Sequence, residues 1–147
     1  LPKGYLVRLP SEAEWEAAAS YAPNAQRRAY PWGAEDPTDK RAIYDASGFD
    51  TPAPVGCCPT GAAGCGALDI AGNVWEWCAS GYKAYPIGSA VIKEDFTPGT
   101  SGYDVPIRGG AYYDDSTFVR CGARIWIFPS RGGYDYGFRL VVSPRSH

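Results

Sequence analysis

Histidine and methionine are nearly absent from this sequence. The only histidine is the terminal His147, and there is no methionine among the 147 residues. Without an internal histidine, the chain has no imidazole to act as the general base of the usual serine or cysteine triads. The same shortage argues against a zinc site, because the spacing of the five cysteines is also wrong for zinc ligands.

Long apolar runs and clusters of positive charge are missing too. No apolar stretch approaches the roughly 18 residues that a membrane-spanning helix requires. The 14 lysines and arginines are scattered and the net charge is −2, so we expect binding neither to nucleic acid nor to an anionic membrane. The opening LPKGYLVRLP is not a secretion signal. It leaves the location open, the cell surface and the extracellular space included.

The sequence is instead rich in residues of irregular structure. Its 18 glycines, 13 prolines and 14% aromatic residues predict few regular helices and large rings packed between loops. The length fits one domain over residues 1–147, which could be the C-terminal part of a longer chain. The odd number of cysteines leaves at least one thiol free or paired between chains. Cys65 either forms a local disulfide with Cys57 or Cys58 or stays reduced.

One helix is clearly signalled. The segment PSEAEWEAAASYA places Ser11 as N-cap and Glu14 three residues later, which is a capping box. These residues predict a helix over about residues 11–21, with Trp15 facing inward.

The remaining pattern predicts short strands and long loops. Residues 74–78 alternate in the manner of a strand, and residues 79–106 form a long loop. The tail holds three strand candidates, VPIRGG, VRCGARIWI and GFRLVVS, with turn residues between them. An antiparallel meander in a loop-rich, mixed α+β fold is the natural prediction.

Two motifs have both a chemical and a structural interpretation. Asn73 and Glu76 in AGNVWEW carry oxygen ligands of the kind that calcium prefers, or they are a left-handed turn residue and a solvated strand residue. Cys121 is either a thiolate activated by Arg120 and Arg124 or a buried, inert cysteine.

Aromatic residues gather in the tail, where residues 112–136 hold 7 of the 21 in the chain. Tyrosine, tryptophan and arginine among aspartate, serine and glycine are typical of binding surfaces made of loops. Core filling is the alternative. It suits Trp126 and Phe138, which lie in or beside strand candidates, better than the aromatic residues that lie beside turns.

The blocks RLPSEAEWEAAA, YPWG, TPAPVG, LDIAGNVWEW, IRGG and GFRLV resemble, in this order, those of formylglycine-generating enzymes and sulfatase-modifying-factor-like domains. The resemblance runs from residue 8 to about residue 142. It implies a C-type-lectin-like fold and favours structural calcium at Asn73 and Glu76. Catalytic members of this family bind copper through two cysteines. Cys121 matches the second, but Ser116 stands at the first, so we expect neither copper nor oxidase activity.

The tail is also similar to that of the variable proteins of diversity-generating retroelements, which share this fold. In those proteins a C-terminal segment ending near a GFR block is rewritten by mutagenesis directed at adenines. Residues 109–139 contain no Lys, Glu, Gln or Met, and these four types cannot be reached from an AAC codon randomised at its two adenines. Trp126 is not reachable either, so we predict that it belongs to the scaffold.

The resulting prediction is a non-catalytic ligand-binding module whose diversified surface covers residues 111–136. We expect its partner to be a protein rather than a carbohydrate. A copper-dependent oxidase using Cys121 and an accessory domain of a larger enzyme are the alternatives. The residues of this surface, called the tail surface below, are Tyr112, Tyr113, Asp115, Phe118, Ile125, Ile127, Phe128, Arg131, Tyr134, Asp135 and Tyr136.

Overall fold

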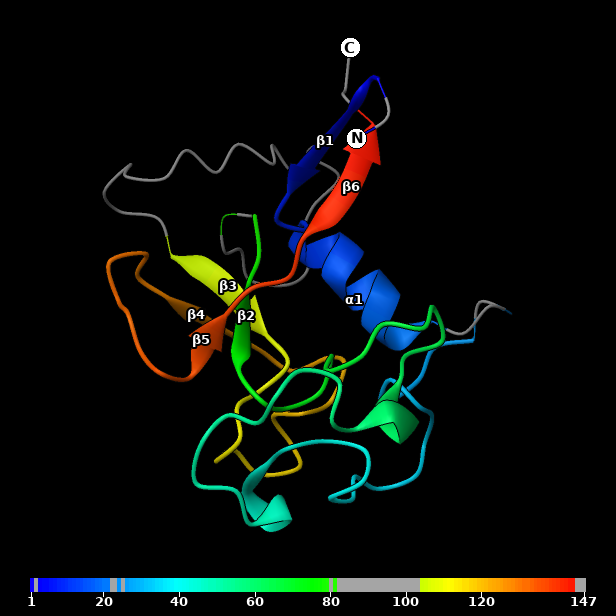
Figure 1. The fold of residues 1–147 in the computed structure, drawn as a ribbon, viewed down its shortest axis with the longest axis vertical. Coiled ribbons are helices and arrows are strands. Elements are labelled where there is room, and N and C mark those ends of the chain that lie inside the picture. Colours follow the sequence, from blue (N-terminus) through cyan, green and yellow to red (C-terminus); the bar gives the residue numbers. More distant parts are fainter. Residues whose placement is uncertain (2, 22–23, 25, 80, 82–103, 145–147) are drawn as a thin grey trace.

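Helix α1 spans Glu12–Ser20 in the computed structural model of the chain (Figure 1). The Ser11 hydroxyl accepts a hydrogen bond from the Glu14 amide at 3.2 Å, and the Glu14 carboxylate accepts one from the Ser11 amide at 2.8 Å. The capping box and the inward position of Trp15, which is 1% exposed, are therefore confirmed. The helix is one residue shorter at each end than predicted.

The structure describes residues 1, 3–21, 24, 26–79, 81 and 104–144. Most of the long loop predicted at 79–106 lies outside these ranges. At nine residues, α1 is the longest helix in the described part of the chain, and no helix there has the length and apolarity needed to cross a membrane.

The strands form two small sheets. A two-stranded antiparallel sheet pairs β1 with β6, and a four-stranded sheet has the order β4-β3-β2-β5. Within the larger sheet β2–β3 and β3–β4 are antiparallel, whereas β2–β5 is parallel. The strands are β1 Tyr5–Arg8, β2 Trp75–Trp77, β3 Val105–Arg108, β4 Arg124–Ile127, β5 Tyr136–Gly137 and β6 Val141–Pro144, and two short 3₁₀ helices are η1 Asp45–Ser47 and η2 Pro59–Gly61.

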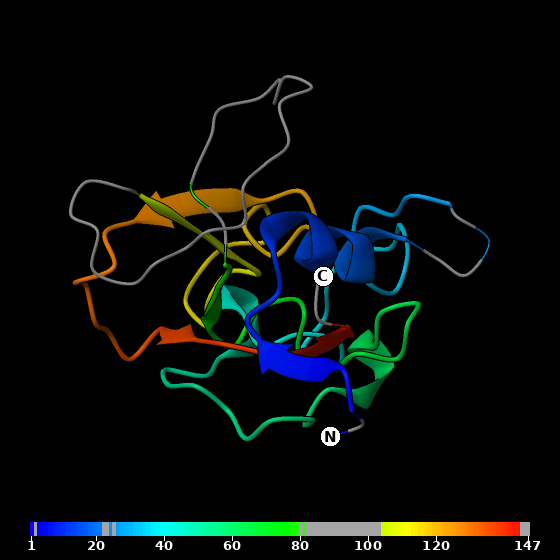
Figure 2. The same ribbon diagram turned by 90° about the horizontal axis from the view of Figure 1, so that it is seen from above.

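Only the first pair of the predicted meander exists. Strands β3 and β4 are antiparallel neighbours, from Val105 opposite Ile127 to Arg108 opposite Arg124. The third candidate, GFRLVVS, divides instead. Its start lies at β5, which joins β2 in parallel, and its end forms β6, which leaves this sheet to pair with β1. Figures 1 and 2 both show β1 and β6 side by side, so the two ends of the described chain lie close together.

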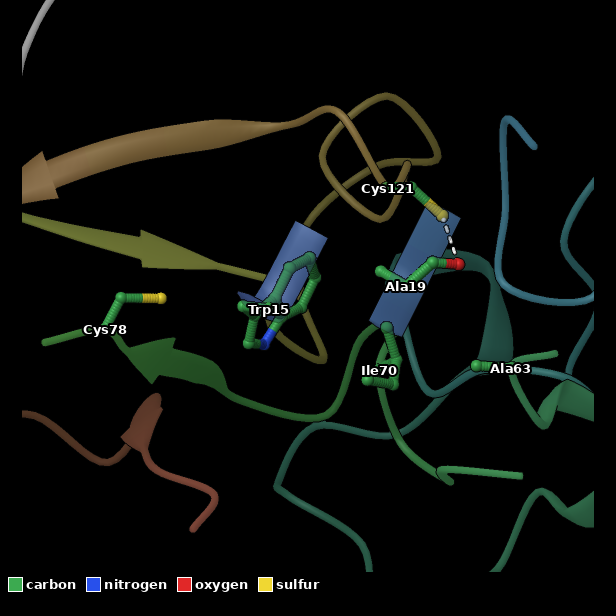
Figure 3. Close-up of a cluster of buried hydrophobic side chains, with 6 residues drawn as sticks. All are labelled: Trp15, Ala19, Ala63, Ile70, Cys78 and Cys121. Carbon is green, nitrogen blue, oxygen red and sulfur yellow. Dashed lines mark hydrogen bonds between the residues drawn. The ribbon is translucent and has the colours of Figure 1, made fainter. Parts of the chain in front are cut away.

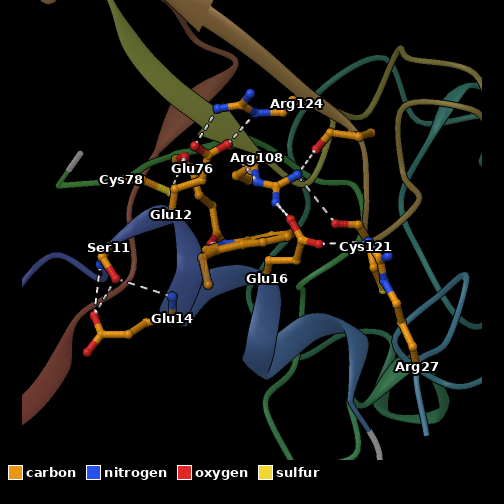
Figure 4. A network of polar contacts seen from close by, with 12 residues as sticks. Ser11, Glu12, Glu14, Glu16, Arg27, Glu76, Cys78, Arg108, Cys121 and Arg124 are labelled. Carbon is orange, nitrogen blue, oxygen red and sulfur yellow. Dashed lines mark hydrogen bonds and ion pairs between the residues drawn. The ribbon is translucent and has the colours of Figure 1, made fainter. Parts of the chain in front are cut away.

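Charged side chains join α1 to the larger sheet (Figure 4). Glu12 and Glu16 are one helical turn apart and so share a face of α1. Between them lies the guanidinium of Arg108, which is fully buried. One of its terminal nitrogens donates to the Glu16 carboxylate. Its Nε lies 3.3 Å from Glu12 Oε1, an ion pair without hydrogen-bond geometry.

Further ion pairs extend this contact in both directions. Glu12 accepts two hydrogen bonds of 2.6 Å from Arg124, and Glu16 accepts one of 2.8 Å from Arg27. The result is an alternating series Arg124–Glu12–Arg108–Glu16–Arg27, called the ion-pair chain below. Because every charge in it faces an opposite charge, the cost of removing Arg108 from water is compensated.

Trp15 lies at the centre of the structure. The Arg108 guanidinium carbon is 5.3 Å from its ring centroid, and its indole nitrogen donates to Glu76 at 2.6 Å. The apolar part of the ring packs in a cluster with the side chains shown in Figure 3, namely Ala19, Ala63, Ile70, Cys78 and Cys121. A second cluster gathers around Tyr30 and Tyr44, and a third around Trp75, Ile107 and Ile127.

We predict that Arg108→Met lowers the free energy of unfolding by about 3–5 kcal/mol, because the buried carboxylate of Glu12 and the half-buried one of Glu16 each lose a cation. The control is Arg41→Met, which removes an exposed ion pair to Glu35 at 3.4 Å and should cost no more than about 1 kcal/mol. Urea denaturation at equilibrium measures both. Equal losses for the two variants would contradict a structural role for the ion-pair chain.

The capping box should give the stability a defined pH dependence. Hydrogen bonds from Arg8, joined by those from Ser11, lower the pKa of Glu14 from 4.5 to about 2. A group with a depressed pKa stabilises the fold above its unfolded pKa and loses that effect as the pH falls. The stability advantage of the wild type over Glu14→Gln should therefore shrink between pH 4.5 and about 2. Urea midpoints across this window measure it, and a constant difference would refute the prediction.

Candidate functional site

Two loops of the tail are attached to the segment that contains β2. In the first loop, residues 111–118, the Tyr112 amide donates to the carbonyl of Asn73 at 3.0 Å. In the second loop, residues 128–135, the carbonyl of Asp135 accepts from the Trp75 amide at 2.7 Å, just before β5 pairs with β2. The positions of both loops are thus set by main-chain bonds to the scaffold.

Aspartate side chains build the turns of the first loop. Asp114 Oδ2 accepts from the Ala111 amide at 2.8 Å, and Asp115 Oδ1 accepts from the Thr117 amide at 2.7 Å. Hydrogen bonds from Thr117 are also the main reason that the pKa of Asp115 is lowered. Asp115 was predicted to contact a ligand. One of its oxygens instead holds the turn, so its first role is to shape the loop.

Most of the tail surface is accessible. Four of its aromatic rings are exposed, and Tyr134, at 93%, is almost completely so. Arg131 and Asp115 are exposed as well, whereas Tyr112, Ile125, Asp135 and Tyr136 are half-buried. The other exposed rings are those of Tyr113, Phe118 and Phe128.

Ile127 does not belong to this surface. It is 8% exposed and packs in the third core cluster, with Ile125 against the edge of that cluster. Alternate residues of a strand face the same side, so Trp126 faces the other way and is 48% exposed. Phe138 is 66% exposed. The prediction that Ile127 faces a ligand is therefore wrong, and the exposure of Trp126 and Phe138 does not fit the alternative that they fill the core.

Trp126 is the exposed residue that the sequence interpretation missed. Its ring meets that of Phe128 edge-on, with centroids 6.1 Å apart. The alternation of RIWI at the end of the strand candidate VRCGARIWI is the signal that could have placed it, because it puts Trp126 on the opposite face from Ile125 and Ile127.

The structure brings four residues of the tail surface together beside β2. The Tyr113 hydroxyl donates to the Asp135 carboxylate, joining the first loop to the second. The ring centroids of Tyr112 and Tyr113 are 5.0 Å apart, and Tyr136 lies 6.0 Å from Trp77. Burial, and then the bond to Asp135, raise the pKa of Tyr113, so the hydroxyl stays protonated and donating. The other members are placed apart, with Phe118 against Trp75 and Phe128 beside β4.

Asn73 and Glu76 have protein partners. Glu76 is 5% exposed and accepts two hydrogen bonds from Arg139, at 2.5 and 2.6 Å, besides that from Trp15. Asn73 has a φ of 71° and pairs its amide with the backbone of Ala53, at 2.8 and 3.2 Å. The left-handed turn is confirmed, whereas Glu76 is a buried ion-pair residue rather than a solvated one.

These contacts do not fit a calcium site at the two residues, because the ion would have to displace Arg139 from Glu76. Over the residues that the structure describes, no three His, Cys, Asp or Glu side chains are grouped so that they could hold a metal. Calcium binding stays a prediction that this geometry does not support.

Cys121 is a buried thiol. It is 1% exposed and its Sγ donates to the Ala19 carbonyl at 3.2 Å (Figure 3). Burial raises the pKa of this thiol to about 11, which opposes the thiolate form that attacks substrates or binds metals. Arg124, one of its expected activators, is bound to Glu12 instead. The interpretation of an inert, buried cysteine is the one that the geometry supports.

The remaining thiols form no disulfide. All five cysteines are free. Cys57 Sγ lies 3.8 Å from Cys58 Sγ, and Cys65 Sγ donates to the Ala18 carbonyl at 3.5 Å. The local bridge to Cys65 is therefore not made in this structure.

Comparisons with known proteins agree on the family and the fold. A family model described as a sulfatase-modifying factor enzyme 1-like domain matches residues 3–144. A hercynine oxygenase of Mycobacterium tuberculosis is 39% identical over 92% of this chain and 32% of its own length. The formylglycine-generating enzyme of Mus musculus is 32% identical over 92% of this chain and 39% of its own length.

Among solved structures, variable protein 1 of Treponema denticola superposes with a TM-score of 0.74 at 27% identity, over 95% of this chain and 48% of that one. With one α-helix, short sheets and many loops among the residues that the structure describes, the chain has the α+β, C-type-lectin-like fold that was expected. It spans about a third of the length of the hercynine oxygenases that it matches.

Two substitutions separate core from surface in the tail. We predict that Ile127→Ala lowers the free energy of unfolding by about 2–5 kcal/mol, because it leaves a cavity in the third core cluster. Tyr134→Ala should change it by no more than about 0.5 kcal/mol, because this ring is exposed. Denaturant titration of both variants checks the difference. If Tyr134→Ala cost as much as Ile127→Ala, its ring would be part of the packing.

Proposed function

The chain belongs to the family of sulfatase-modifying factor enzyme 1-like domains, and we propose that it is a non-catalytic module that presents a variable tail surface to a ligand. The observation that carries this proposal is the exposure of Tyr113, Phe118, Phe128 and Tyr134 on loops that are fixed by other residues. Exposed rings cost free energy in water, and large aromatic side chains displayed on loops are typical of binding surfaces.

The construction of the loops supports variation. The turns of the first loop depend on Asp114 and Asp115, and the end of the second depends on backbone pairing with β2. Substituting Tyr113 or Tyr134 removes none of these bonds. Substituting Tyr113 removes a different one, the hydrogen bond from its hydroxyl to the Asp135 carboxylate. The likeness to a protein named as variable favours the same use of the fold.

The partner that we propose is a protein. Rigid aromatic rings give a large contact area at little cost in side-chain entropy, and Arg131 adds an exposed positive charge. The proposal includes neither nucleic acid nor membrane insertion, and it leaves the location of the module open, the cell surface and the extracellular space included. It also treats residues 1–147 as one domain.

A catalytic role is the first alternative, because the relatives named above include enzymes. The Cys121 thiol would have to leave its bond to Ala19 and lose its proton before it could react. The half-buried Ser116 stands where the resemblance places the partner cysteine. Both observations favour the binding module over an oxidase.

An accessory domain of a larger enzyme is the second alternative, and a separate observation favours it. Tyr5, Val7 and Val142 are 40%, 45% and 58% exposed on one face of the β1–β6 pair. This face is apolar and lies outside the tail surface. In such a domain, the face would pack against another part of the enzyme.

The proposal is tested by randomising Tyr113, Phe118, Phe128, Arg131 and Tyr134 in a display library. We expect folded variants that bind different target proteins, because the scaffold bonds are untouched. A matched library at the exposed residues Tyr21, Phe49 and Val55 should yield far fewer binders. Loss of folding throughout the tail library would contradict the proposal. So would copper-dependent oxidation of a cysteine-containing sulfatase peptide that disappears with Cys121→Ser.

A further inference from the structure

We propose that a second site, a pocket lined by three arginines, binds a tetrahedral oxyanion group such as a phosphate or a sulfate ester. The pocket has a volume of about 590 Å³ and lies between the loop at residues 27–29 and the turn at residues 117–123. Its cationic side chains are Arg27, Arg28 and Arg120. Thr117, Arg120, Gly122 and Ala123 of its lining fall within residues 111–136, but none of them is among the residues of the tail surface, so binding at this site and at the tail surface can be measured separately.

The charge of the pocket is strongly one-sided, because no acidic residue is among those that line it. Arg27 donates one hydrogen bond of 2.8 Å to Glu16, and Arg28 donates one of 3.0 Å to the carbonyl of Pro31. Each guanidinium has five N–H donors, so both keep donors for a ligand. Arg120 is exposed and makes no ion pair within the described part of the chain.

Besides Glu16, which binds Arg27, the carboxylate to consider is that of Asp115, two residues before the lining residue Thr117. It is occupied by Thr117, whose amide and hydroxyl donate to it at 2.7 and 2.5 Å. The charge of Arg120 acts on this carboxylate, but only as a minor cause of its lowered pKa, after the Thr117 hydrogen bonds. Asp115 therefore offsets part of the charge of Arg120 without forming an ion pair with it.

Both walls of the pocket are held from inside by Arg108. Its Nη1 donates to the carbonyls of Cys121, at 3.4 Å, and Ala123, at 2.6 Å, and these residues form the turn that follows Arg120. Its other terminal nitrogen binds Glu16, which in turn holds Arg27, as Figure 4 shows. The two walls also meet directly, since the Cys121 amide donates to the Ala29 carbonyl at 2.9 Å.

Walls whose backbone is fixed in this way need no ordering when a ligand binds. Guanidinium groups match the geometry of phosphate and sulfate oxygens, to which they donate pairs of parallel hydrogen bonds. The pocket is several times larger than one such group, so we infer that the anion is an ester on a larger molecule. No carboxylate is among the residues that line the pocket, so we do not expect it to bind a cation.

Calorimetric titration of the folded chain at constant ionic strength tests the site. The probes are inorganic phosphate, inorganic sulfate, glucose 6-phosphate and a sulfated monosaccharide. We expect saturable binding of at least one ester, with Arg120→Gln weakening it by roughly tenfold, since a charge-assisted hydrogen bond is lost. Arg120 is the residue to change, because its side chain supports no ion pair that the fold needs.

The matched control is Lys40→Gln, which removes an exposed cation that lies outside both the pocket and the tail surface and should leave the affinity unchanged. A preference for the phosphate ester assigns the site to phosphorylated ligands, and a preference for the sulfate ester assigns it to sulfated ones. The proposal is overturned if no probe binds, if Arg120→Gln binds as well as the wild type, or if Lys40→Gln weakens binding equally.

Discussion

The buried guanidinium of Arg108 is the contact on which most of this structure depends. Arg108 lies on β3, forms ion pairs with Glu12 and Glu16 of α1, and stacks on Trp15. It also donates hydrogen bonds to two carbonyls of the turn that follows Arg120. A loop-rich chain has few regular hydrogen-bonded elements to fix the position of α1. A planar, permanently charged group with five directional donors fixes it better than an apolar contact, because it has one satisfactory orientation. Buried ion pairs add little net stability but can specify one arrangement over others.

The local features of the fold were predictable, and the distant pairings were not. The capping box needs only Ser11 and Glu14, three residues apart, so the sequence displays the start of α1 directly. The partners of Glu16 and Glu76 lie much further along the chain, at Arg108 and Arg139, and no local pattern announces them. For the same reason Glu76 was expected to be either a calcium ligand or a solvated residue, whereas Trp15 and Arg139 bind its carboxylate in the interior. The departure of β6 towards β1 is likewise decided by a partner at the other end of the chain.

The tail surface shows where local patterns mislead. Strand β4 has only four residues and is rich in large apolar side chains, so the alternation of buried and exposed positions is easily overlooked there. Once the strand is present, alternation alone decides that Ile127 enters the core and Trp126 does not. The exposure of Tyr113 and Tyr134 was predicted for a sound reason, since both lie among turn residues with polar neighbours. The turns themselves rest on Asp114 and Asp115, and of these two, only Asp115 was assigned a role from the sequence.

The structure separates the residues that fix the fold from those that face solvent, and this separation favours binding over catalysis. Glu76 and Cys121 have side chains that could take part in catalysis or bind a metal, but they are bound to Arg139 and Ala19 in the interior. The large exposed rings, in contrast, carry no bond on which the helix or the sheets depend, except where Tyr113 meets Asp135. An active site requires reactive groups that are both positioned and accessible, whereas a binding surface requires only that side chains be accessible on a stable support. Arg108 provides that support from within, and because none of its contacts is with the exposed rings, those rings can change without disturbing it.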